Sequence, residues 1–207
     1  MSLSQLAQQL FQYLSNTTWY EYLAVISGIL SVWLGTRERI LYYPIGLINT
    51  LIYIYISIEG HLIGEASVNI YYTIMSIIGW INWAKKDVRS QKTLQISYSN
   101  QKEWIQQIVF FLFFYTCIYF CLIYFKTYFL QGIIPWADAL ASAAAFTGMW
   151  LINKKKMENW YWWALTNVVS VPLYFVKHYV FSSFYFLALL ILCFFGWHSW
   201  KKKIHAS

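Results

Sequence analysis

The sequence predicts an all-α integral membrane protein with seven transmembrane helices, arranged as two parallel three-helix repeats joined by a linker helix. Three observations lead to this fold class. The 207 residues are 59% hydrophobic and only 11% charged, whereas a soluble domain carries about 25% charged residues. Apolar stretches of about 17 to 25 residues, the length that crosses a bilayer, recur along nearly the whole chain. Motifs of the first half also return in the second half.

The apolar stretches give the helices in order. We expect them at residues 20–36, 40–58, 62–84, 104–125, 136–153, 159–176 and 180–200. Backbone polar groups in hydrocarbon must be paired within the segment, so each stretch is read as a helix. The first three helices form one bundle over residues 20–85, the last three form a second over 136–200, and 104–125 is the linker helix.

The remaining segments are polar or basic. Residues 86–103 are predicted to form a cytoplasmic loop, and residues 201–207 a basic cytoplasmic tail. Residues 1–19 are predicted to be extracytoplasmic, and within them 3–15 have the apolar spacing of an amphipathic helix lying at the membrane surface. The start of the chain lacks the charged region of a signal peptide, so cleavage is not expected.

The positive charges predict the orientation. Lys and Arg are retained in cytoplasmic loops, and thirteen of the fifteen fall on one side of the predicted membrane. The thirteen are Arg37, Arg39, Lys85, Lys86, Arg89, Lys92, Lys102, Lys154, Lys155, Lys156, Lys201, Lys202 and Lys203, while Lys126 and Lys177 fall opposite. The amino terminus is therefore expected outside and the carboxyl terminus in the cytoplasm.

The internal repeat has an offset of 117 residues. The motif GWINWAKK, beginning at Gly79, returns as GWHSWKKK, beginning at Gly196. With one extra residue, an offset of 118, Asn49 falls on Asn167. Two consecutive three-helix units would point in opposite directions, and the single helix between them makes them parallel, as in several transporter folds.

Two amides mark the middle of the second and sixth predicted helices. Asn49 and Asn167 must bond neighbouring helices or face a hydrated cavity, and both uses remain open. We expect the matched amides to converge in a water-accessible chamber at the bilayer centre. Tyr53, four residues after Asn49, and Trp163, four residues before Asn167, share a helix face with these amides.

A polar stripe on the third helix holds Glu65, Asn69 and Tyr72. A carboxylate about one turn inside the membrane is costly, so Glu65 is a functional candidate, with a headgroup-facing carboxylate as the alternative. Three further carboxylates, Glu21, Glu59 and Asp138, are expected near the same outer surface. The outer mouth should therefore be acidic and attract a cationic solute.

Further aromatic residues complete the candidate site. Trp33 and Trp150 occupy equivalent positions in the two repeats, and Tyr174 lies on the sixth helix. Aromatic faces and amides together suit a flat, cationic heteroaromatic ligand. Helix packing is the alternative role of each aromatic residue.

The sequence gives no sign of an enzyme. It has no phosphate-binding glycine loop, no HxxxH or CxxC ligand pair, and no nucleophile with a Ser, His and Asp set. Cys117, Cys121 and Cys193 lie inside apolar stretches and are read as packing residues. We therefore expect no catalytic residues, no metal, no cofactor and no nucleic-acid partner.

Longer motifs resemble a known family. The stretches EYLAVISGILSVWLGTRERILYYPIGLINTLIYIYI, NIYY, IIGWINW and ENWYWWALTNVVSVPLYFVKHYV resemble the bacterial Pnu-type (PnuC-like) vitamin transporters, related in turn to the SWEET sugar transporters. The resemblance covers residues 20–203. It implies a 3+1+3 helix arrangement in the bacterial inner membrane and facilitated diffusion of an unphosphorylated vitamin precursor, which a cytoplasmic kinase then traps.

The resemblance places nicotinamide riboside first among substrates, with thiamine as the alternative from the same family. A non-transporting sensor or scaffold is the alternative from another class, and a proton-coupled symporter would require Glu65 to titrate. The sequence leaves open whether the chain forms a homo-oligomer.

Overall fold

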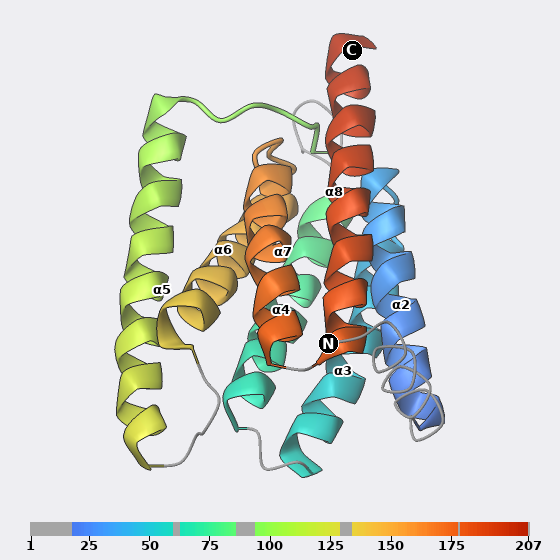
Figure 1. Cartoon of the computed structure of the whole chain (residues 1–207). Coiled ribbons are helices and arrows are strands. Elements are labelled where there is room, and N and C mark those ends of the chain that lie inside the picture. The colour runs from blue at the N-terminus through green and yellow to red at the C-terminus, as the bar shows by residue number, and fades with distance from the viewer. Residues whose placement is uncertain (1–17, 60–62, 86–93, 129–133, 178, 207) are drawn as a thin grey trace.

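The computed structural model describes residues 18–59, 63–85, 94–128, 134–177 and 179–206. Within these ranges the chain forms seven helices (Figure 1). They are α2 (Trp19–Thr36), α3 (Tyr42–Glu59), α4 (Ile63–Ala84), α5 (Gln101–Tyr128), α6 (Pro135–Asn153), α7 (Asn159–Val176) and α8 (Val180–Ala206). The predicted seven-helix class is confirmed. The predicted amphipathic segment 3–15 and residues 86–93 of the predicted loop lie outside the described residues.

The helix ends that differ most from the prediction are those of α5 and α8. α5 begins at Gln101 instead of 104, because Asn100 and Glu103 form a reciprocal cap in which each side chain accepts the other's backbone N–H at 2.9 Å. α8 continues to Ala206, so residues 201–206 of the predicted tail are helical. Lysines are good helix formers and need not end a helix.

The helices are 18 to 28 residues long, which corresponds to roughly 27 to 42 Å. By length and apolar composition alone, α5 and α8 stand out as spans, with mean hydropathies of 2.0 and 2.1. The other helices carry small polar residues on their buried sides, such as Ser27 and Ser31 on α2 and Thr50 on α3. Hydropathy falls where a helix faces other helices through polar side chains instead of facing lipid.

Six helices form a closed ring. Each packs on two neighbours in the order α2, α3, α4, α6, α7, α8 and back to α2. The two halves therefore meet along two equivalent helix pairs, α2 with α8 and α6 with α4. The linker helix α5 lies outside the ring against α6 (Figure 1).

A buried polar network ties α5 to the second half. The Gln107 side chain is fully buried, donates to Ser99 Oγ at 2.7 Å and accepts the Trp162 indole N–H at 3.1 Å. Ser99 in turn donates its backbone N–H and hydroxyl to the buried Glu158 carboxylate at 2.9 and 2.7 Å. The side chains of Ser99, Gln107 and Glu158 thus all have partners, and the linker helix is fixed to the half that follows it.

Hydrogen bonds reproduce the sequence repeat across the ring. Trp83 Nε1 donates to the Ile152 carbonyl at 3.1 Å, and Trp200 Nε1 donates to the Gly35 carbonyl at 3.0 Å. Trp83 and Trp200 are 117 residues apart, and so are Gly35 and Ile152. Each half therefore donates to the other through the same pair of positions, as parallel repeats related by a pseudo-two-fold axis require.

The offset of 117 also continues through the second helix of each half, where a shift to 118 was predicted. Asn49 Nδ2 donates to the Ala24 carbonyl at 2.7 Å, and Thr166 Oγ1 donates to the Ala141 carbonyl at 3.2 Å. Ala24 and Ala141 are 117 residues apart, as are Asn49 and Thr166. Thr166, and not Asn167, is therefore the structural equivalent of Asn49.

Candidate functional site

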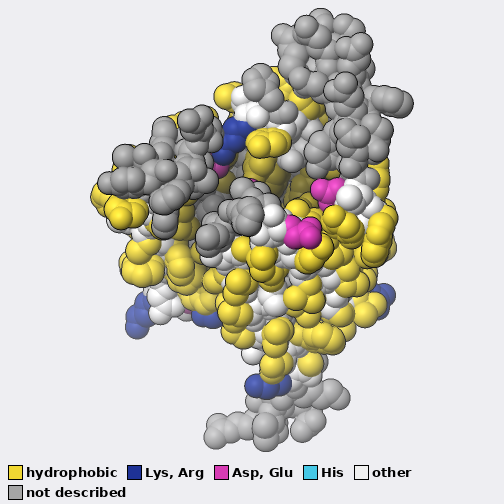
Figure 2. All heavy atoms as spheres, turned by 90° about the horizontal axis from the view of Figure 1, so that it is seen from below, with side chains coloured by type: hydrophobic (Ala, Val, Ile, Leu, Met, Phe, Trp, Pro, Cys, Tyr) yellow, Lys and Arg dark blue, Asp and Glu magenta, His cyan; other side chains and the backbone are white. Residues whose placement is uncertain are grey.

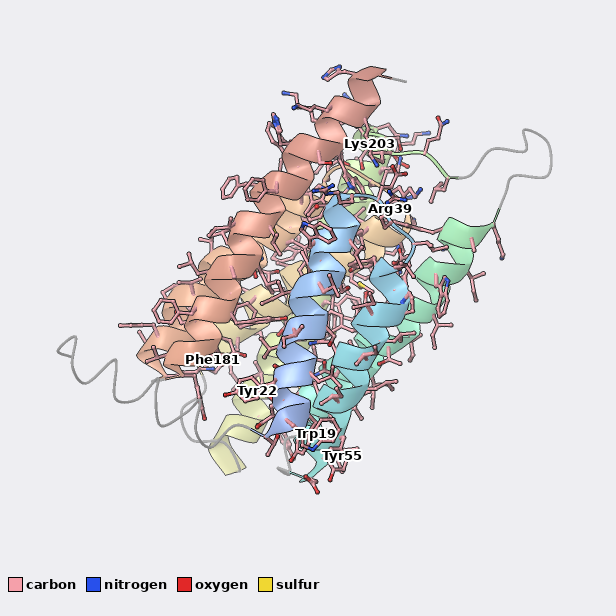
Figure 3. All side chains as sticks on the ribbon, turned by 90° about the vertical axis from the view of Figure 1, so that its right-hand side faces the viewer. Trp19, Tyr22, Arg39, Tyr55, Phe181 and Lys203 are labelled. Carbon is pink, nitrogen blue, oxygen red and sulfur yellow. The ribbon has the colours of Figure 1, made fainter. Side chains whose placement is uncertain are left out.

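The two ends of the bundle differ in charge. Lys203 and Arg39 lie at one end, and Trp19 and Tyr55 lie at the other (Figure 3). We call the first the basic end, after Arg37, Arg39, Lys154, Lys155, Lys156, Lys201, Lys202 and Lys203. We call the second the acidic end, after Glu21, Glu59, Glu65 and Asp138.

Two of the acidic-end carboxylates have local partners. The Glu21 carboxylate accepts the Thr18 backbone N–H at 2.7 Å, in the first turn of α2. The Glu59 carboxylate accepts the Tyr55 hydroxyl at 2.6 Å. These two carboxylates are held at helix ends. The remaining acidic-end carboxylates are those of Glu65 and Asp138.

Glu65, Asp138 and Lys177 form a charged mouth at the acidic end. Lys177 Nζ lies 2.6 and 2.8 Å from the two Asp138 oxygens, and Glu65 interacts electrostatically with both residues. Glu65 is exposed, whereas Asp138 and Lys177 are largely buried. Figure 2 shows acidic side chains among hydrophobic ones on this face. The mouth joins α4 of the first half to α6 and α7 of the second.

Below the mouth lies a central aromatic cluster, which we define as Tyr72, Phe146, Trp163, Tyr174 and Tyr185. Tyr72 is nine residues after the start of α4, so it lies about 14 Å along the helix. Its ring centroid is 6.0 Å from that of Phe146 and 6.2 Å from that of Trp163. Tyr174 and Tyr185 are within electrostatic range of Tyr72. Side chains of α4, α6 and α7 thus contact one another inside the ring, with Tyr185 of α8 nearby.

The cluster is asymmetric although the backbone is nearly symmetric. The Trp163 indole lies directly on Gly148, where an added Cβ would meet the ring at 3.1 Å. At the equivalent positions of the first half stand Gly46 and Ser31, and an added Cβ on Gly46 would meet Ser31 Oγ at 2.9 Å. One half offers a flat aromatic surface where the other offers a small hydroxyl.

Asn49 lies beside this cluster. Its side chain is half-buried and, together with the Tyr185 hydroxyl, closely approaches Gly28 of α2. A Cβ at position 28 would meet the Tyr185 hydroxyl at 2.5 Å and Asn49 Nδ2 at 2.8 Å. Glycine at this position therefore lets α2, α3 and α8 bring an amide and a phenol together.

The two predicted amides do not face each other, so the expected convergence is wrong. Asn167 is 2% exposed, and its Nδ2 lies 3.4 Å from Cys193 Sγ of α8, while Asn49 bonds Ala24 of α2. Each amide thus links helices of its own half. The one-residue register difference between the repeats turns Asn167 away from the direction of Asn49, because successive helix positions differ by about 100°.

The structure places the other predicted site residues in three environments. Tyr53 is half-buried and lies within electrostatic range of Tyr174, next to the central cluster. Asn69 Nδ2 donates to the Glu65 carbonyl of its own helix at 2.9 Å, directly below the mouth. Trp33 and Trp150 lie elsewhere.

Trp33 and Trp150 contact groups outside the ring's centre. Trp33 is 41% exposed on α2, with the Arg37 guanidinium 4.9 Å from its ring. Trp150 stacks on Phe110 of the linker helix, with centroids 4.8 Å apart, and Lys154 Nζ lies 4.2 Å from its ring.

Sequence reasoning missed Phe146 and Tyr185. Phe146 had no signal, since phenylalanine occurs throughout the chain. Tyr185 carries a hydroxyl inside the run FYFLALLILCFF of α8, and a polar atom in such a run must find a partner away from lipid. That signal was available.

Comparisons with known proteins agree with this architecture. The family model described as nicotinamide mononucleotide transporter matches residues 18–202. The riboflavin/roseoflavin transporter RibM of Streptomyces davaonensis is 23% identical over 183 residues, covering 88% of this chain and 84% of that protein. The nicotinamide riboside transporter PnuC of Escherichia coli is 21% identical over 205 residues, covering 89% and 86%.

A solved structure has the same fold. The crystal structure of the vitamin B3 transporter PnuC superposes with a TM-score of 0.72 at 19% identity, covering 97% of this chain and 88% of that chain. The family match spans almost the whole ring and the linker helix. The chain belongs to the nicotinamide mononucleotide transporter family and is a multi-pass membrane transporter of the PnuC type.

Proposed function

We propose that this chain is a uniporter that imports an unphosphorylated, cationic vitamin precursor, nicotinamide riboside, by alternating access between its two halves. The observation that carries the proposal is the central aromatic cluster, which lies below the carboxylate of Glu65 between the two halves. The bound ligand would contact the aromatic and polar residues Tyr72, Trp163, Tyr174, Tyr185, Tyr53 and Asn49. Trp33, Trp150 and Asn167 are not proposed as ligand contacts. The two tryptophans contact groups outside the ring's centre, and Asn167 bonds within its own half.

The direction of transport follows from the charges of the two ends. Positively charged segments stay in the cytoplasm, so the basic end faces inward in the bacterial inner membrane and the acidic end faces outward. The solute enters past Glu65 and leaves at the basic end. A cytoplasmic kinase that phosphorylates it would keep the downhill flow inward.

The mouth favours a cation over a phosphorylated solute. Glu65 lies at the entrance. Lys177 is the basic side chain among the described residues of the mouth, and it is already paired with Asp138. A phosphate monoester carries about −1.5 to −2 charges at neutral pH. Such a solute would be repelled by the Glu65 carboxylate, and no unpaired basic side chain in the described part of the mouth would offset this repulsion. A pyridinium cation is instead attracted by Glu65.

The cluster favours a small ring with a polar end. Tyr and Trp faces attract a cationic ring through cation–π interaction and stacking, while the Asn49 amide and the Tyr185 hydroxyl can bond ribose hydroxyls. Thiamine is also a cationic heteroaromatic and remains the alternative from the sequence. Riboflavin, named for RibM, is neutral and would gain stacking but no attraction from Glu65.

Thermal unfolding of the purified protein with each ligand tests the substrate. A ligand that binds only the folded state stabilises it by about 2.7 kcal/mol at a hundredfold excess over Kd. We expect nicotinamide riboside to raise the unfolding midpoint, and its 5′-phosphate to leave it unchanged. Stabilisation by thiamine alone would transfer the assignment to thiamine, and stabilisation by riboflavin alone would contradict the cationic site.

The Glu65→Gln variant serves as the matched control in the same assay. The carboxylate is exposed, so removing its charge should weaken nicotinamide riboside binding by no more than about fivefold, with no effect on a neutral ligand. An equal loss for charged and neutral ligands would mean that the substitution disturbs the fold instead of the electrostatic attraction.

A further inference from the structure

Two equivalent loop residues pair across the pseudo-two-fold axis at the basic end. Glu38 follows α2 and Lys155 follows α6, 117 residues apart, and Lys155 Nζ lies 2.6 Å from Glu38 Oε1. They are also the two non-glycine residues with positive φ in the described chain, at 59° and 49°. Such residues rarely adopt this conformation. The repeat thus holds both loops in an unusual shape that brings opposite charges together.

A third residue joins the pair from α8. Lys203 Nζ lies 2.8 Å from Glu38 Oε2 and donates to the Arg37 carbonyl at 3.0 Å. Both lysines belong to the second half, and Glu38 belongs to the first. Lys155 Nζ also lies 4.6 Å from the Trp83 ring of the first half. A single carboxylate therefore holds two lysines of the opposite half.

The carboxylate is charged in this arrangement. Partial burial opposes ionisation of Glu38, but hydrogen bonds and charge attraction from Lys155 and Lys203 outweigh it and hold the pKa of Glu38 below its ordinary value. The Lys155 side chain is 7% exposed, so its ammonium has little access to water and depends on the contacts with Glu38 and Trp83.

Beneath these charges the ring is filled by aromatic side chains of both halves. Trp83 and Trp200 have centroids 6.3 Å apart and are 4% and 0% exposed. Each donates to a backbone carbonyl of the opposite half. The fully buried Tyr43 adds a further bond, from its hydroxyl to Asn153 Oδ1 at 3.0 Å. While these residues stay packed, we expect them to block the passage of a ring-shaped ligand.

We propose that Glu38, Lys155 and Lys203, with Trp83 and Trp200 beneath them, form the inner gate of the transport path, and that the structure is the inward-closed state. The proposal rests on the proposed function, since it takes the basic end as the exit. Glu38 holds the gate shut, and the two tryptophans exclude water and solute. Release of the solute requires the Glu38 bridges to break, so that the second half can swing away from the first.

Reaction of Cys193 with a water-soluble thiol reagent tests the gate. Cys193 is 3% exposed and belongs to the same buried cluster as Trp83 and Trp200, whereas Cys117 and Cys121 are exposed on α5 and are replaced by serine. The protein is placed in nanodiscs without substrate. The Glu38→Gln variant keeps the side-chain shape and removes the charge, and we expect it to raise the Cys193 reaction rate at least about tenfold.

The chain offers a matched control at the same end. Glu103 pairs with Lys156 at 2.8 Å, but α5 is fixed to the second half, so Glu103→Gln breaks an ion pair without uncoupling the halves. It should leave Cys193 unreactive. Lys203→Gln gives a second gate variant at an exposed position, and we expect a smaller increase from it.

Unchanged Cys193 reactivity in Glu38→Gln and Lys203→Gln would overturn the proposal, as would an equal increase in Glu103→Gln. Because no substrate is present, the result does not depend on which vitamin is carried. A wrong substrate assignment would fail the ligand-binding assay and leave the gate result intact.

Discussion

Replacing Trp163 with alanine is expected to raise the Kd for nicotinamide riboside by about 10- to 100-fold. The indole lies flat on Gly148, next to Tyr72, and is the widest aromatic surface in the central cluster. Loss of stacking on such a surface costs about 1–3 kcal/mol per ring, and each 1.4 kcal/mol is tenfold in Kd. Titration of the purified variant with the ligand measures the change.

Trp150→Ala is the control for this prediction. It also removes a tryptophan, but from the neighbouring helix α6, where the indole stacks on Phe110 of α5. We expect the Kd to stay within about twofold of the unmodified protein, because the Trp150 indole packs on the linker helix, although packing is lost. Equal losses of affinity in the two variants would place the ligand outside the central cluster.

The Gly79→Ala and Gly196→Ala variants are expected to have the largest effects on stability. An added Cβ at Gly79 would collide with Tyr43 and Asn153, and one at Gly196 would collide with the Trp160 ring. These neighbours are buried, so the helices must move apart. Overpacking of this kind costs about 1–3 kcal/mol or more in the free energy of unfolding. The thermal unfolding midpoint should therefore fall in both variants, and the two decreases should be similar to each other.

Gly46→Ala provides the comparison, because the nearest atom to an added Cβ there is the Ser31 hydroxyl, which is small. We expect this variant to unfold close to the temperature of the unmodified protein. A large loss in Gly79→Ala with none in Gly196→Ala would show that the two positions are not equivalent in packing.

The fold was predictable because the sequence patterns that indicate it extend over many residues. Seven apolar stretches, the distribution of lysine and arginine, and the repeated GWxxW motif all act over many residues. Helix ends depend on single side chains, and the reciprocal cap of Asn100 and Glu103 was readable from the sequence as an N-x-x-E pattern before the linker helix. The extension of α8 through Lys203 was not, since lysines fit a helix and a tail equally well.

The site was harder to predict because side-chain identity and helix face can disagree. Asn49 and Asn167 were paired on identity, but the bonds to Ala24 and Ala141 show that Thr166 takes the equivalent place. One residue of register rotates a side chain by about 100° and sends it to another helix. An amide inside a membrane helix predicts that a hydrogen-bond partner exists, but the sequence does not show which residue it is.

Aromatic residues were uncertain for a different reason. In a soluble protein an exposed tryptophan is unusual, but in a membrane an indole fits lipid, the interface and the interior alike. Trp33 and Trp163 could not be separated by pattern, yet one lies at 41% exposure and the other lies on Gly148. The three-dimensional neighbours of α2 and α7 decide the difference.

Uptake by proteoliposomes tests the central claim most directly. Purified protein is reconstituted, and entry of labelled nicotinamide riboside is followed with no ion gradient, with a proton gradient and with a sodium gradient. A uniporter with an aromatic site at the ring's centre should equilibrate the solute at the same rate in all three conditions, and Trp163→Ala should slow entry at low solute concentration. Entry that requires an ion gradient, or that proceeds unchanged in Trp163→Ala, would contradict the account.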